Sequence, residues 1–250
     1  MGLLEIIKKN KLAGKKSLAV LIDPESTDNN KVARLVQLAS SVGVDYFFVG
    51  GSTAQYNEMD ETLGLLQELS EIPTFIFPGN VSQLNNKADA LLYLSLISGR
   101  NPDLLIGKQV ESVPFLRKNS LEVIPTGYLL IDGGNQSSVA YISNTTPIPE
   151  RHIEVAVNTA LAGQYLGMQL IYLEAGSGAL NPVCTQMISA VSQALYIPLI
   201  VGGGIRNPET AQLALNAGAD LIVIGNILEK DPEALIDISI AVHRENPINS

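Results

Sequence analysis

The chain has 250 residues, of which 46% are hydrophobic and only 16% charged, so it can fill a large core and is not expected to be disordered. Its 25 acidic and 16 basic residues give a formal net charge of −9. That balance argues against a nucleic-acid-binding protein, because phosphate backbones require clustered Lys and Arg. With one cysteine and two histidines, we expect neither an intrachain disulfide nor a Cys- or His-rich metal site.

The first 16 residues are mixed and lysine-bearing, and they carry no signal-peptide pattern. No apolar run approaches the ~18 residues that a membrane-spanning helix needs. We therefore predict a cytoplasmic protein, and peripheral membrane contact through an apolar groove stays open.

Eight short segments rich in Val, Ile, Leu, Tyr and Phe are predicted to be strands. Their hydrophobicity is nearly continuous, which is typical of parallel strands buried on both faces. In chain order they are residues 17–23, 45–51, 72–79, 88–97, 123–132, 169–175, 197–204 and 220–226.

Helical spacing of apolar residues predicts helices between these strands, and Pro114 is expected to bend or end the third of them. Three of the helices open with a proline, where the missing N–H costs nothing, and the residue before each proline is a good N-cap. The helices are residues 30–42, 58–69, 103–118, 153–166, 182–195, 208–217 and 232–243; the cap and proline pairs are Asn181–Pro182, Asn207–Pro208 and Asp231–Pro232.

About eight β/α alternations in 250 residues predict one domain, residues 1–250, folded as a single (β/α)8 TIM-type barrel, with an irregular third helix region allowed for. A doubly wound open sheet is the alternative, but it seldom uses eight strands in so short a chain. Residues 132–151 are polar and lack clear periodicity, so we expect a mobile loop over the mouth of the barrel.

Glycines follow the last three predicted strands. Gly202-Gly203-Gly204 and Gly225-Asn226 end the seventh and eighth strands, and Gly176-Ser177-Gly178 follows the sixth. Glycine lets backbone N–H groups approach an anion closely, and barrels frequently bind phosphate after strands seven and eight. The pattern favours a phosphate site; the alternative is that these glycines only form tight turns.

Oxygen ligands follow the first two predicted strands. Asp23 and Glu25 flank a proline at one strand end, and Ser52 follows the neighbouring strand, which suits Mg2+ and a substrate phosphate. A cap or loop role for the carboxylates is the alternative. Glu174 ends an apolar strand and is expected to face the mouth, where it would accept a hydrogen bond or a proton; bonding to loop amides is its structural alternative.

Other polar residues have less specific signals. Asp45 begins a strand and is assigned to the face of the barrel that serves stability. Arg206 follows the triple glycine and would either contact phosphate or cap a helix. His152 is interpreted as a surface residue, His243 as a solvated helix-end residue and Cys184 as a buried or half-buried small residue.

Five segments together resemble the geranylgeranylglyceryl phosphate synthases and the related bacterial PcrB-type heptaprenylglyceryl phosphate synthases. The similarity runs from about residue 15 to about residue 230, and the Tyr-Leu-Glu-Ala-Gly-Ser-Gly run is its most specific part. Bacterial PcrB-type proteins have Lys-Leu-Asp-Pro where this chain has Leu-Ile-Asp-Pro, so the match is closer to the larger archaeal-type group. The segments are Leu21-Ile22-Asp23-Pro24-Glu25, Gly50-Gly51-Ser52, residues 172–179, Val201-Gly202-Gly203-Gly204-Ile205-Arg206 and Gly225-Asn226.

The resemblance implies a Mg2+-dependent prenyltransferase. Such an enzyme joins the C3 hydroxyl of sn-glycerol 1-phosphate to a polyprenyl diphosphate, such as geranylgeranyl diphosphate, and releases diphosphate. Asp23 and Ser52 would be the Mg2+ ligands. The residues that would bind glycerol 1-phosphate are Tyr172, Leu173, Glu174, Ala175, Gly176, Ser177, Gly178, Gly203, Gly204, Gly225 and Asn226. The family also implies a homo-oligomer, a dimer or larger, and membrane contact through the prenyl product.

The chemistry of this reaction agrees with the residues. Diphosphate leaves only when its growing negative charge is neutralised, which Mg2+ does. Glu174 and Tyr172 would be the catalytic residues: both would orient the glycerol hydroxyl, and Glu174 would accept its proton. The prenyl chain needs a long apolar groove, for which Phe75, Phe77, Leu92 and Leu94 are candidates.

Two other functions remain open from the sequence. A phosphosugar isomerase or lyase barrel would share the phosphate loops but needs an acid/base pair acting on a carbon acid. A catalytically inactive phosphate-ligand binder would keep the loops without turnover.

Overall fold

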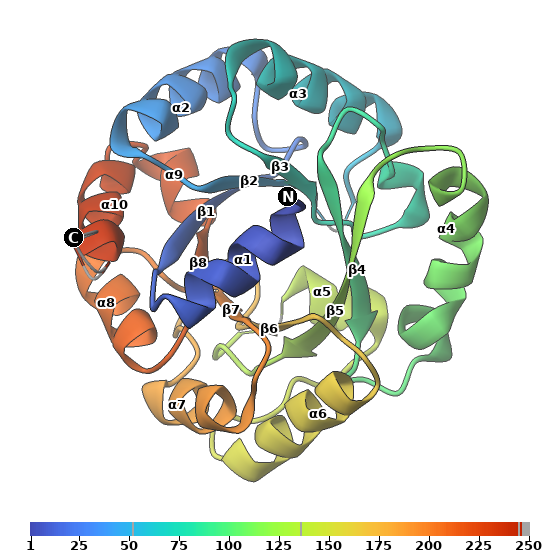
Figure 1. Ribbon diagram of the computed structural model, residues 1–250, viewed down its shortest axis with the longest axis vertical. Coiled ribbons are helices and arrows are strands. Elements are labelled where there is room, and N and C mark those ends of the chain that lie inside the picture. The colour runs from blue at the N-terminus through green and yellow to red at the C-terminus, as the bar shows by residue number, and fades with distance from the viewer. Residues whose placement is uncertain (52, 136, 245, 247–250) are drawn as a thin grey trace.

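The computed structural model describes residues 1–51, 53–135, 137–244 and 246. Eight parallel strands form a closed barrel in which each strand pairs with its neighbour in the sequence and β8 closes onto β1 (Figure 1). The predicted (β/α)8 fold is confirmed, and every predicted strand is present. The strands are β1 Ser17–Ile22, β2 Tyr46–Val49, β3 Thr74–Ile76, β4 Ala90–Leu96, β5 Glu122–Leu130, β6 Leu170–Glu174, β7 Leu199–Gly202 and β8 Leu221–Ile224.

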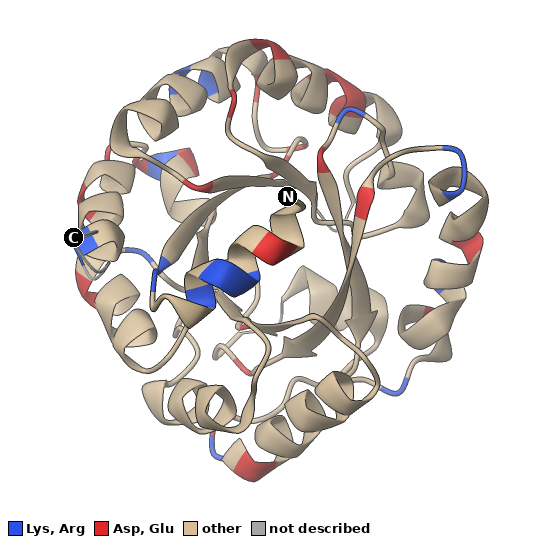
Figure 2. Ribbon diagram, viewed as in Figure 1, with Lys and Arg blue, Asp and Glu red and all other residues tan. Residues whose placement is uncertain are grey.

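Helices surround the barrel and close its ends. Figure 2 shows that charged residues are concentrated on the helices and loops, whereas the strands are nearly free of them. The helices are α1 Leu3–Leu12, α2 Asn29–Val42, α3 Tyr56–Leu69, α4 Lys108–Leu116, α5 Ser138–Ser143, α6 Ile153–Tyr165, α7 Thr185–Ala194, α8 Pro208–Asn216, α9 Asn226–Lys230 and α10 Ala234–Arg244, with a 3-10 turn η1 Val81–Gln83 and a π-helical turn η2 Asp103–Gly107.

The continuous hydrophobicity of the strands has a simple cause. Successive side chains on a strand point to opposite faces, and both faces of each strand are covered. In β2, Phe47 belongs to the core between the barrel and the helices, whereas Tyr46 and Phe48 belong to the core inside the barrel. The barrel interior is therefore packed with side chains, and any ligand must bind at its ends.

The helix α1 was not predicted; Ile7 is its only buried residue. It lies across the N-terminal end of the barrel (Figure 1). The N–H groups of Leu3 and Leu4 donate to the Glu122 carboxylate at the start of β5, with distances of 2.6 and 3.1 Å. This end is closed, which leaves the C-terminal strand ends as the place for a site.

The expected helix starts are correct for one of the three prolines. Asn207 caps α8, and its side chain accepts from Thr210 N at 2.9 Å. The prediction is wrong for Pro182, because α7 begins only at Thr185. In the loop, this stretch packs closely on Gly204, where a Cβ would lie 2.7 Å from Pro182 N, and Asn181 N donates to the Gly133 carbonyl at 3.0 Å. The last helix likewise begins at Ala234, and Asp231 ends α9 instead of capping α10.

Two connections on the C-terminal side shape the site. The third connection is irregular, as allowed for, with only η1 between β3 and β4. Residues 132–151 are not a plain loop, which corrects the prediction: they contain α5, which the Ser137 hydroxyl caps by accepting from Ala140 N at 3.2 Å. A six-residue helix is too short to show periodicity. The segment lies over the mouth of the barrel, as expected, and its mobility stays a prediction. Pro114 lies in the last turn of α4, which ends two residues later.

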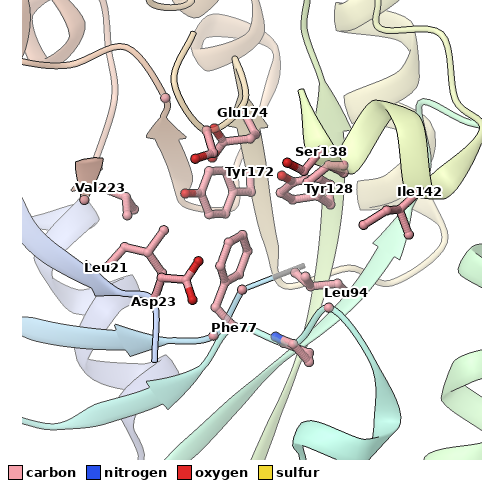
Figure 3. A pocket seen from close by; sticks show the side chains of 18 of the residues that line it. Leu21, Asp23, Phe77, Leu94, Tyr128, Ser138, Ile142, Tyr172, Glu174 and Val223 are labelled. Carbon is pink, nitrogen blue, oxygen red and sulfur yellow. The ribbon is translucent and has the colours of Figure 1, made fainter. Parts of the chain in front are cut away.

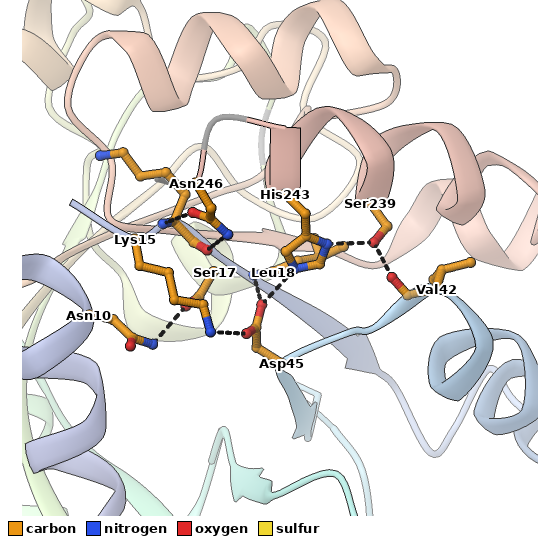
Figure 4. Close-up of polar contacts among 10 residues, drawn as sticks. Asn10, Lys15, Ser17, Leu18, Val42, Asp45, Ser239, His243 and Asn246 are labelled. Atoms are coloured by element: carbon orange, nitrogen blue, oxygen red, sulfur yellow. Dashed lines mark hydrogen bonds and ion pairs between the residues drawn. The ribbon is translucent and has the colours of Figure 1, made fainter. Parts of the chain in front are cut away.

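A polar cluster at the N-terminal end ties α10 to β2 (Figure 4). Asp45 accepts from Leu18 N at 2.9 Å and lies 3.2 Å from His243 Nε2; Nδ1 of the same ring lies 3.0 Å from the Ser239 hydroxyl. The stability role of Asp45 fits this placement. The prediction for His243 is only partly right: it lies in the last turn of α10, but its side chain is 29% exposed and contacts Asp45, so it is half-buried instead of fully solvated.

His152 and Cys184 lie as predicted: His152 is exposed, and Cys184 is half-buried and forms no disulfide. Across the described part of the chain, no helix combines the length and the apolarity that crossing a membrane requires.

Candidate active site

A pocket of about 390 Å³ opens at the C-terminal ends of the strands. Its wall has three chemically different parts: a glycine-rich part from the ends of β6, β7 and β8, a carboxylate-bearing part from the ends of β1 and β2, and an apolar part from the end of β3, β4, η2 and α5. Lys108, Gln109 and Ser112 of α4 add polar groups beside the apolar part. Figure 3 shows Glu174 and Tyr172 on one side of the cavity, Asp23 on the other and Phe77 between them. All three parts therefore face one space.

Glu174 is the last residue of β6 and is only 6% exposed. Its Oε1 accepts a hydrogen bond from Gly176 N at 2.7 Å. Burial raises the pKa of this carboxyl to about 7, although the Gly176 amide and the nearby Tyr172 hydroxyl both act to lower it. At neutral pH the group therefore exchanges between its acid and its base form, which suits a proton acceptor.

Tyr172 lies beneath Glu174, two residues earlier on the same face of β6. Its ring stacks on Phe77 at 5.4 Å and meets the edge of Tyr128 at 5.3 Å. The hydroxyl is buried, and within the described residues it has no partner that meets both the distance and the angle of a hydrogen bond. Burial, with the Glu174 charge, raises its pKa well above the ordinary value. A ligand hydroxyl in the pocket would satisfy this buried group.

The glycine-rich part of the wall depends on backbone shapes that other residues rarely adopt. Gly203 and Gly204 have φ of 82° and 73°, and Gly178 has φ of 72°. Among the described residues, no acceptor binds the N–H groups of Gly203 and Gly204. Asn226 joins the ends of β6 and β8, since its Oδ1 accepts from Gly178 N at 3.3 Å. This wall offers amide donors to an anion.

Six of the residues assigned to glycerol phosphate line this part of the pocket: Ser177, Gly178, Gly203, Gly204, Gly225 and Asn226. Tyr172 and Glu174 line it as well. Leu173 and Ala175 do not line it, because strand alternation turns their side chains into the core between barrel and helices; their assignment, which only their backbone could fulfil, stays a prediction. Gly176 also does not line the pocket, and its N–H is taken by Glu174.

Arg206 lines the pocket, its side chain caps no described helix, and its contact with phosphate stays a prediction. Its guanidinium donates to the carbonyls of Ala179 and, at 3.3 Å, Leu180. It therefore holds the loop that follows β6, which carries the glycine-rich wall.

Asp23 follows β1 on the opposite side of the pocket. Its Oδ1 accepts from Glu25 N at 3.0 Å. Burial raises its pKa; the Glu25 amide partly offsets this, and the charges of Glu25, Glu229 and Glu58 add to the rise. Ser52, the other predicted Mg2+ ligand, lies outside the described residues. Its neighbour Gly51 lies so close that a Cβ there would be 2.6 Å from Asp23 Oδ1.

This donor set fits Mg2+ better than a transition metal. Within the described ranges, no group of three or more His, Cys, Asp or Glu is arranged around a metal position. Mg2+ is usually held by one or two carboxylates together with waters and substrate phosphates. Asp23, whose pKa is raised by burial and by the charges of neighbouring carboxylates, also gains from a nearby cation.

The apolar part of the wall is only partly as predicted. Phe77 and Leu94 line the pocket, together with Leu91, Leu104 and Ile142. Phe75 and Leu92 do not, because they lie deeper on their strands and are fully buried inside the barrel. The pocket extends toward Gln109 and Ser112 of α4, where the third connection has only a short turn in place of a helix.

Tyr128 was missed by sequence reasoning. It lines the pocket, is 5% exposed and pairs in register with Tyr172 across β5 and β6. Burial, with the Glu174 charge, raises its pKa well above the ordinary value. The available signal was a tyrosine within an otherwise apolar strand end.

The closed (β/α)8 barrel, with a buried carboxylic acid and glycine-rich turns at the C-terminal strand ends, has the architecture in which barrel enzymes place their active sites. The sequence profile of the PcrB family matches residues 10–243, and the chain belongs to this family.

Curated relatives point the same way. The geranylgeranylglyceryl phosphate synthase of Chitinophaga pinensis is 49% identical, covering 95% of this chain and 94% of that protein. The synthase of Thermococcus kodakarensis is 40% identical, with 92% and 91% covered. The sequence resemblance is thus confirmed, and the chain is an enzyme of the geranylgeranylglyceryl phosphate synthase type.

Solved structures agree. The (S)-3-O-geranylgeranylglyceryl phosphate synthase of Thermoplasma acidophilum, crystallised with its substrate sn-glycerol-1-phosphate, superimposes with a TM-score of 0.92 at 35% identity, covering 98% of this chain and 99% of that one. Thiamine phosphate pyrophosphorylase of Pyrococcus furiosus, at 15% identity and a TM-score of 0.60, shares the fold alone.

Proposed function

We propose that the protein transfers the prenyl group of a polyprenyl diphosphate, such as geranylgeranyl diphosphate, to the C3 hydroxyl of sn-glycerol 1-phosphate, with Mg2+ and release of diphosphate. The observation that carries this proposal is the shared pocket of Glu174, the unpartnered Tyr172 hydroxyl, the glycine-rich wall and Asp23. The Thermoplasma acidophilum structure, whose substrate is sn-glycerol-1-phosphate, supports the choice of acceptor.

The glycine-rich wall binds the phosphate of glycerol 1-phosphate. The amides of Gly203 and Gly204 and the side chains of Ser177 and Asn226 are neutral donors, which bind a phosphomonoester through its oxygens. A three-carbon alcohol anchored there lies within the same pocket as Glu174 and Tyr172. The buried Tyr172 hydroxyl lies near Glu174 but forms no geometrically complete hydrogen bond among the described residues, so a ligand hydroxyl there would give it a partner.

Glu174 accepts the proton of the C3 hydroxyl as its oxygen attacks C1 of the prenyl group. The bond from C1 to the diphosphate oxygen breaks with its electron pair, and the new C–O bond is the ether. Since the pKa of Glu174 is about 7, the carboxylate is basic enough to take that proton and still populated at neutral pH.

The allylic carbon becomes cationic as diphosphate departs. The faces of Phe77, Tyr172 and Tyr128 form an aromatic group in the pocket, and ring faces stabilise a nearby positive charge. Asp23 and Ser52 would hold Mg2+, which neutralises the charge of the departing diphosphate when bound. The prenyl tail follows the apolar wall past Leu94 toward α4.

The test mixes purified protein, Mg2+, sn-glycerol 1-phosphate and labelled geranylgeranyl diphosphate, and detects the ether lipid by mass spectrometry. We expect product, none after addition of EDTA, and much less with sn-glycerol 3-phosphate. Prenyl donors of other lengths show which chain the groove takes. The absence of an ether product with every prenyl donor tested, short or long, would contradict the proposal.

The same assay separates the two alternatives. A phosphosugar isomerase or lyase would convert a phosphosugar without a prenyl donor, and a pure binder would retain the acceptor without turnover. We also propose that the protein is a cytoplasmic homo-oligomer, a dimer or larger, that meets membranes through its prenyl product. Light scattering and vesicle flotation with and without product test these two points.

A further inference from the structure

Gln83 is a buried polar residue whose three hydrogen bonds join two loops of the pocket. It ends the turn η1 and is 1% exposed. Its Nε2 donates to the carbonyls of Gly51 at 2.8 Å and Ala54 at 3.0 Å, and its Oε1 accepts from Gly79 N at 2.8 Å. The carboxamide therefore bonds to two loops at the same time. It contacts the loop after β2 at Gly51 and Ala54, and the loop after β3 at Gly79.

Both loops form the pocket wall opposite the glycine-rich part. Gly50, Gly51 and Thr53 line the pocket from the first loop, and Pro78 and Gly79 from the second. The contact between Gly51 and the Asp23 carboxylate is so close that no side chain fits between them. A displacement of the loop after β2 therefore displaces the surroundings of Asp23 directly.

The loop after β2 leads into α3 and is tied to Glu25 by the Thr53 hydroxyl, whereas the loop after β3 leads into no α-helix. Elsewhere in the barrel a helix follows each strand end, but after β3 only three residues form a turn. Burying an amide costs free energy unless its groups are paired, and here every donor and acceptor used is a backbone group of a pocket loop. Asn85, two residues later and 2% exposed, binds instead to Asp60 at 2.8 Å and Lys87 N at 2.9 Å, away from the pocket.

We propose that Gln83 is a positioning residue for the diphosphate half of the site: it fixes the loop after β2 beside Asp23, so that the prenyl diphosphate with its Mg2+ is held against the anchored glycerol phosphate. The inference rests on the proposed function and adds a residue that touches neither substrate. Residues that orient a metal ligand from behind commonly change metal affinity or activity by roughly 10- to 100-fold when removed.

The test compares two substitutions of a buried amide by an apolar side chain of similar shape, Gln83→Met and Asn85→Leu. Calorimetry measures the Kd of sn-glycerol 1-phosphate, and then the Kd of Mg2+ with inorganic diphosphate on protein saturated with glycerol 1-phosphate. For Gln83→Met we expect the Kd of Mg2+–diphosphate to rise about tenfold, and the Kd of glycerol 1-phosphate to stay within about twofold of the wild-type value. Asn85→Leu should lower the melting temperature by a similar amount and leave both Kd values unchanged.

Equal weakening of both ligands by Gln83→Met, no weakening of either, or the same asymmetry in Asn85→Leu overturns the inference. If Gln83→Met does not fold, Gln83→Glu replaces it, since a carboxylate still accepts from Gly79 N but cannot donate to Gly51 or Ala54. Wild-type protein that binds glycerol 1-phosphate but no Mg2+–diphosphate overturns the proposed function itself, and the inference with it. A wild type that binds both, without the asymmetry in the variants, overturns the inference alone.

Discussion

The two ends of the barrel use buried carboxylates in opposite ways. At the N-terminal end, Asp220 accepts from Leu199 N at 2.8 Å and pairs with Lys11 at 2.9 Å, and Asp45 is bonded to Leu18 N and lies 3.7 Å from Lys15. At the C-terminal end, Glu174 and Asp23 each accept one backbone N–H, and neither forms an ion pair with any described residue. Paired carboxylates hold the fold, whereas unpaired ones keep a raised pKa and remain free for a ligand.

Among the substitutions that test this difference between the two ends, Glu174→Gln is expected to have the largest effect. The carboxamide keeps the shape but cannot take a proton, so kcat should fall by roughly 10²- to 10⁴-fold while the fold is retained. Initial rates at saturating substrates measure it. The matched change at the other end, Asp45→Asn, should cost stability and leave kcat within about twofold. Equal kcat in the two variants would contradict the division of roles.

Asp23→Asn removes the carboxylate that faces the glycine-rich wall. Loss of one charge that stabilises the departing group costs roughly 10²- to 10³-fold in kcat. The Mg2+ concentration for half-maximal rate should rise, and the Kd of glycerol 1-phosphate should stay unchanged, since its wall is intact. Rates across a Mg2+ titration and calorimetry with glycerol 1-phosphate test this, and a weaker glycerol 1-phosphate Kd would count against it.

The raised pKa of Glu174 makes both activity and stability depend on pH. The ordinary value is 4.5 and the folded value about 7, so between these values the folded protein binds more protons than the unfolded chain. This group therefore favours the folded state most below its unfolded pKa, and that contribution, ~3 kcal/mol, is lost as pH rises to about 7. The rate should rise with pH and level off above about 7, because the base form is the active one.

The stability part is measured by urea unfolding of wild type and Glu174→Gln at pH 5 and pH 8. The free energy of unfolding of the wild type should fall relative to that of the variant on going to pH 8. A difference that does not change with pH, or that changes in the other direction, would refute the assignment.

The smallest effect is expected from two glycines that share a backbone shape. Gly203→Ala and Gly14→Ala both place a side chain at positive φ, 82° and 68°, which costs roughly 1–3 kcal/mol. A Cβ at Gly14 meets nothing within 4 Å, whereas one at Gly203 would collide with the Glu174 carboxylate and lie 2.8 Å from Gly176 N and 2.9 Å from Ala175 N. Calorimetry should show weaker binding of glycerol 1-phosphate for Gly203→Ala only. Equally weakened binding in both variants would contradict a role of this wall in binding phosphate.

The sequence was informative where one physical rule dominates. Parallel strands buried on both faces must be apolar throughout, so all eight were found, and Asn207 was recognised as an N-cap because its side-chain oxygen accepts a hydrogen bond from a backbone N–H only three residues later. It was uninformative where distant contacts compete with local preference. Pro182 lies in a loop that packs on Gly204, and α1 forms over the barrel end with one buried residue.

For the site, the residue types at the strand ends could be predicted from the chain, because the ends of parallel strands meet at one rim. The sequence by itself therefore determined the barrel, the glycine-rich strand ends and the positions of Asp23 and Glu174. Only the tertiary structure decided that Leu173 and Ala175 face away, that the Tyr172 hydroxyl is left without a partner, and that Gln83 joins two pocket loops. Those outcomes depend on register and on contacts between residues far apart in the chain, which no local pattern specifies.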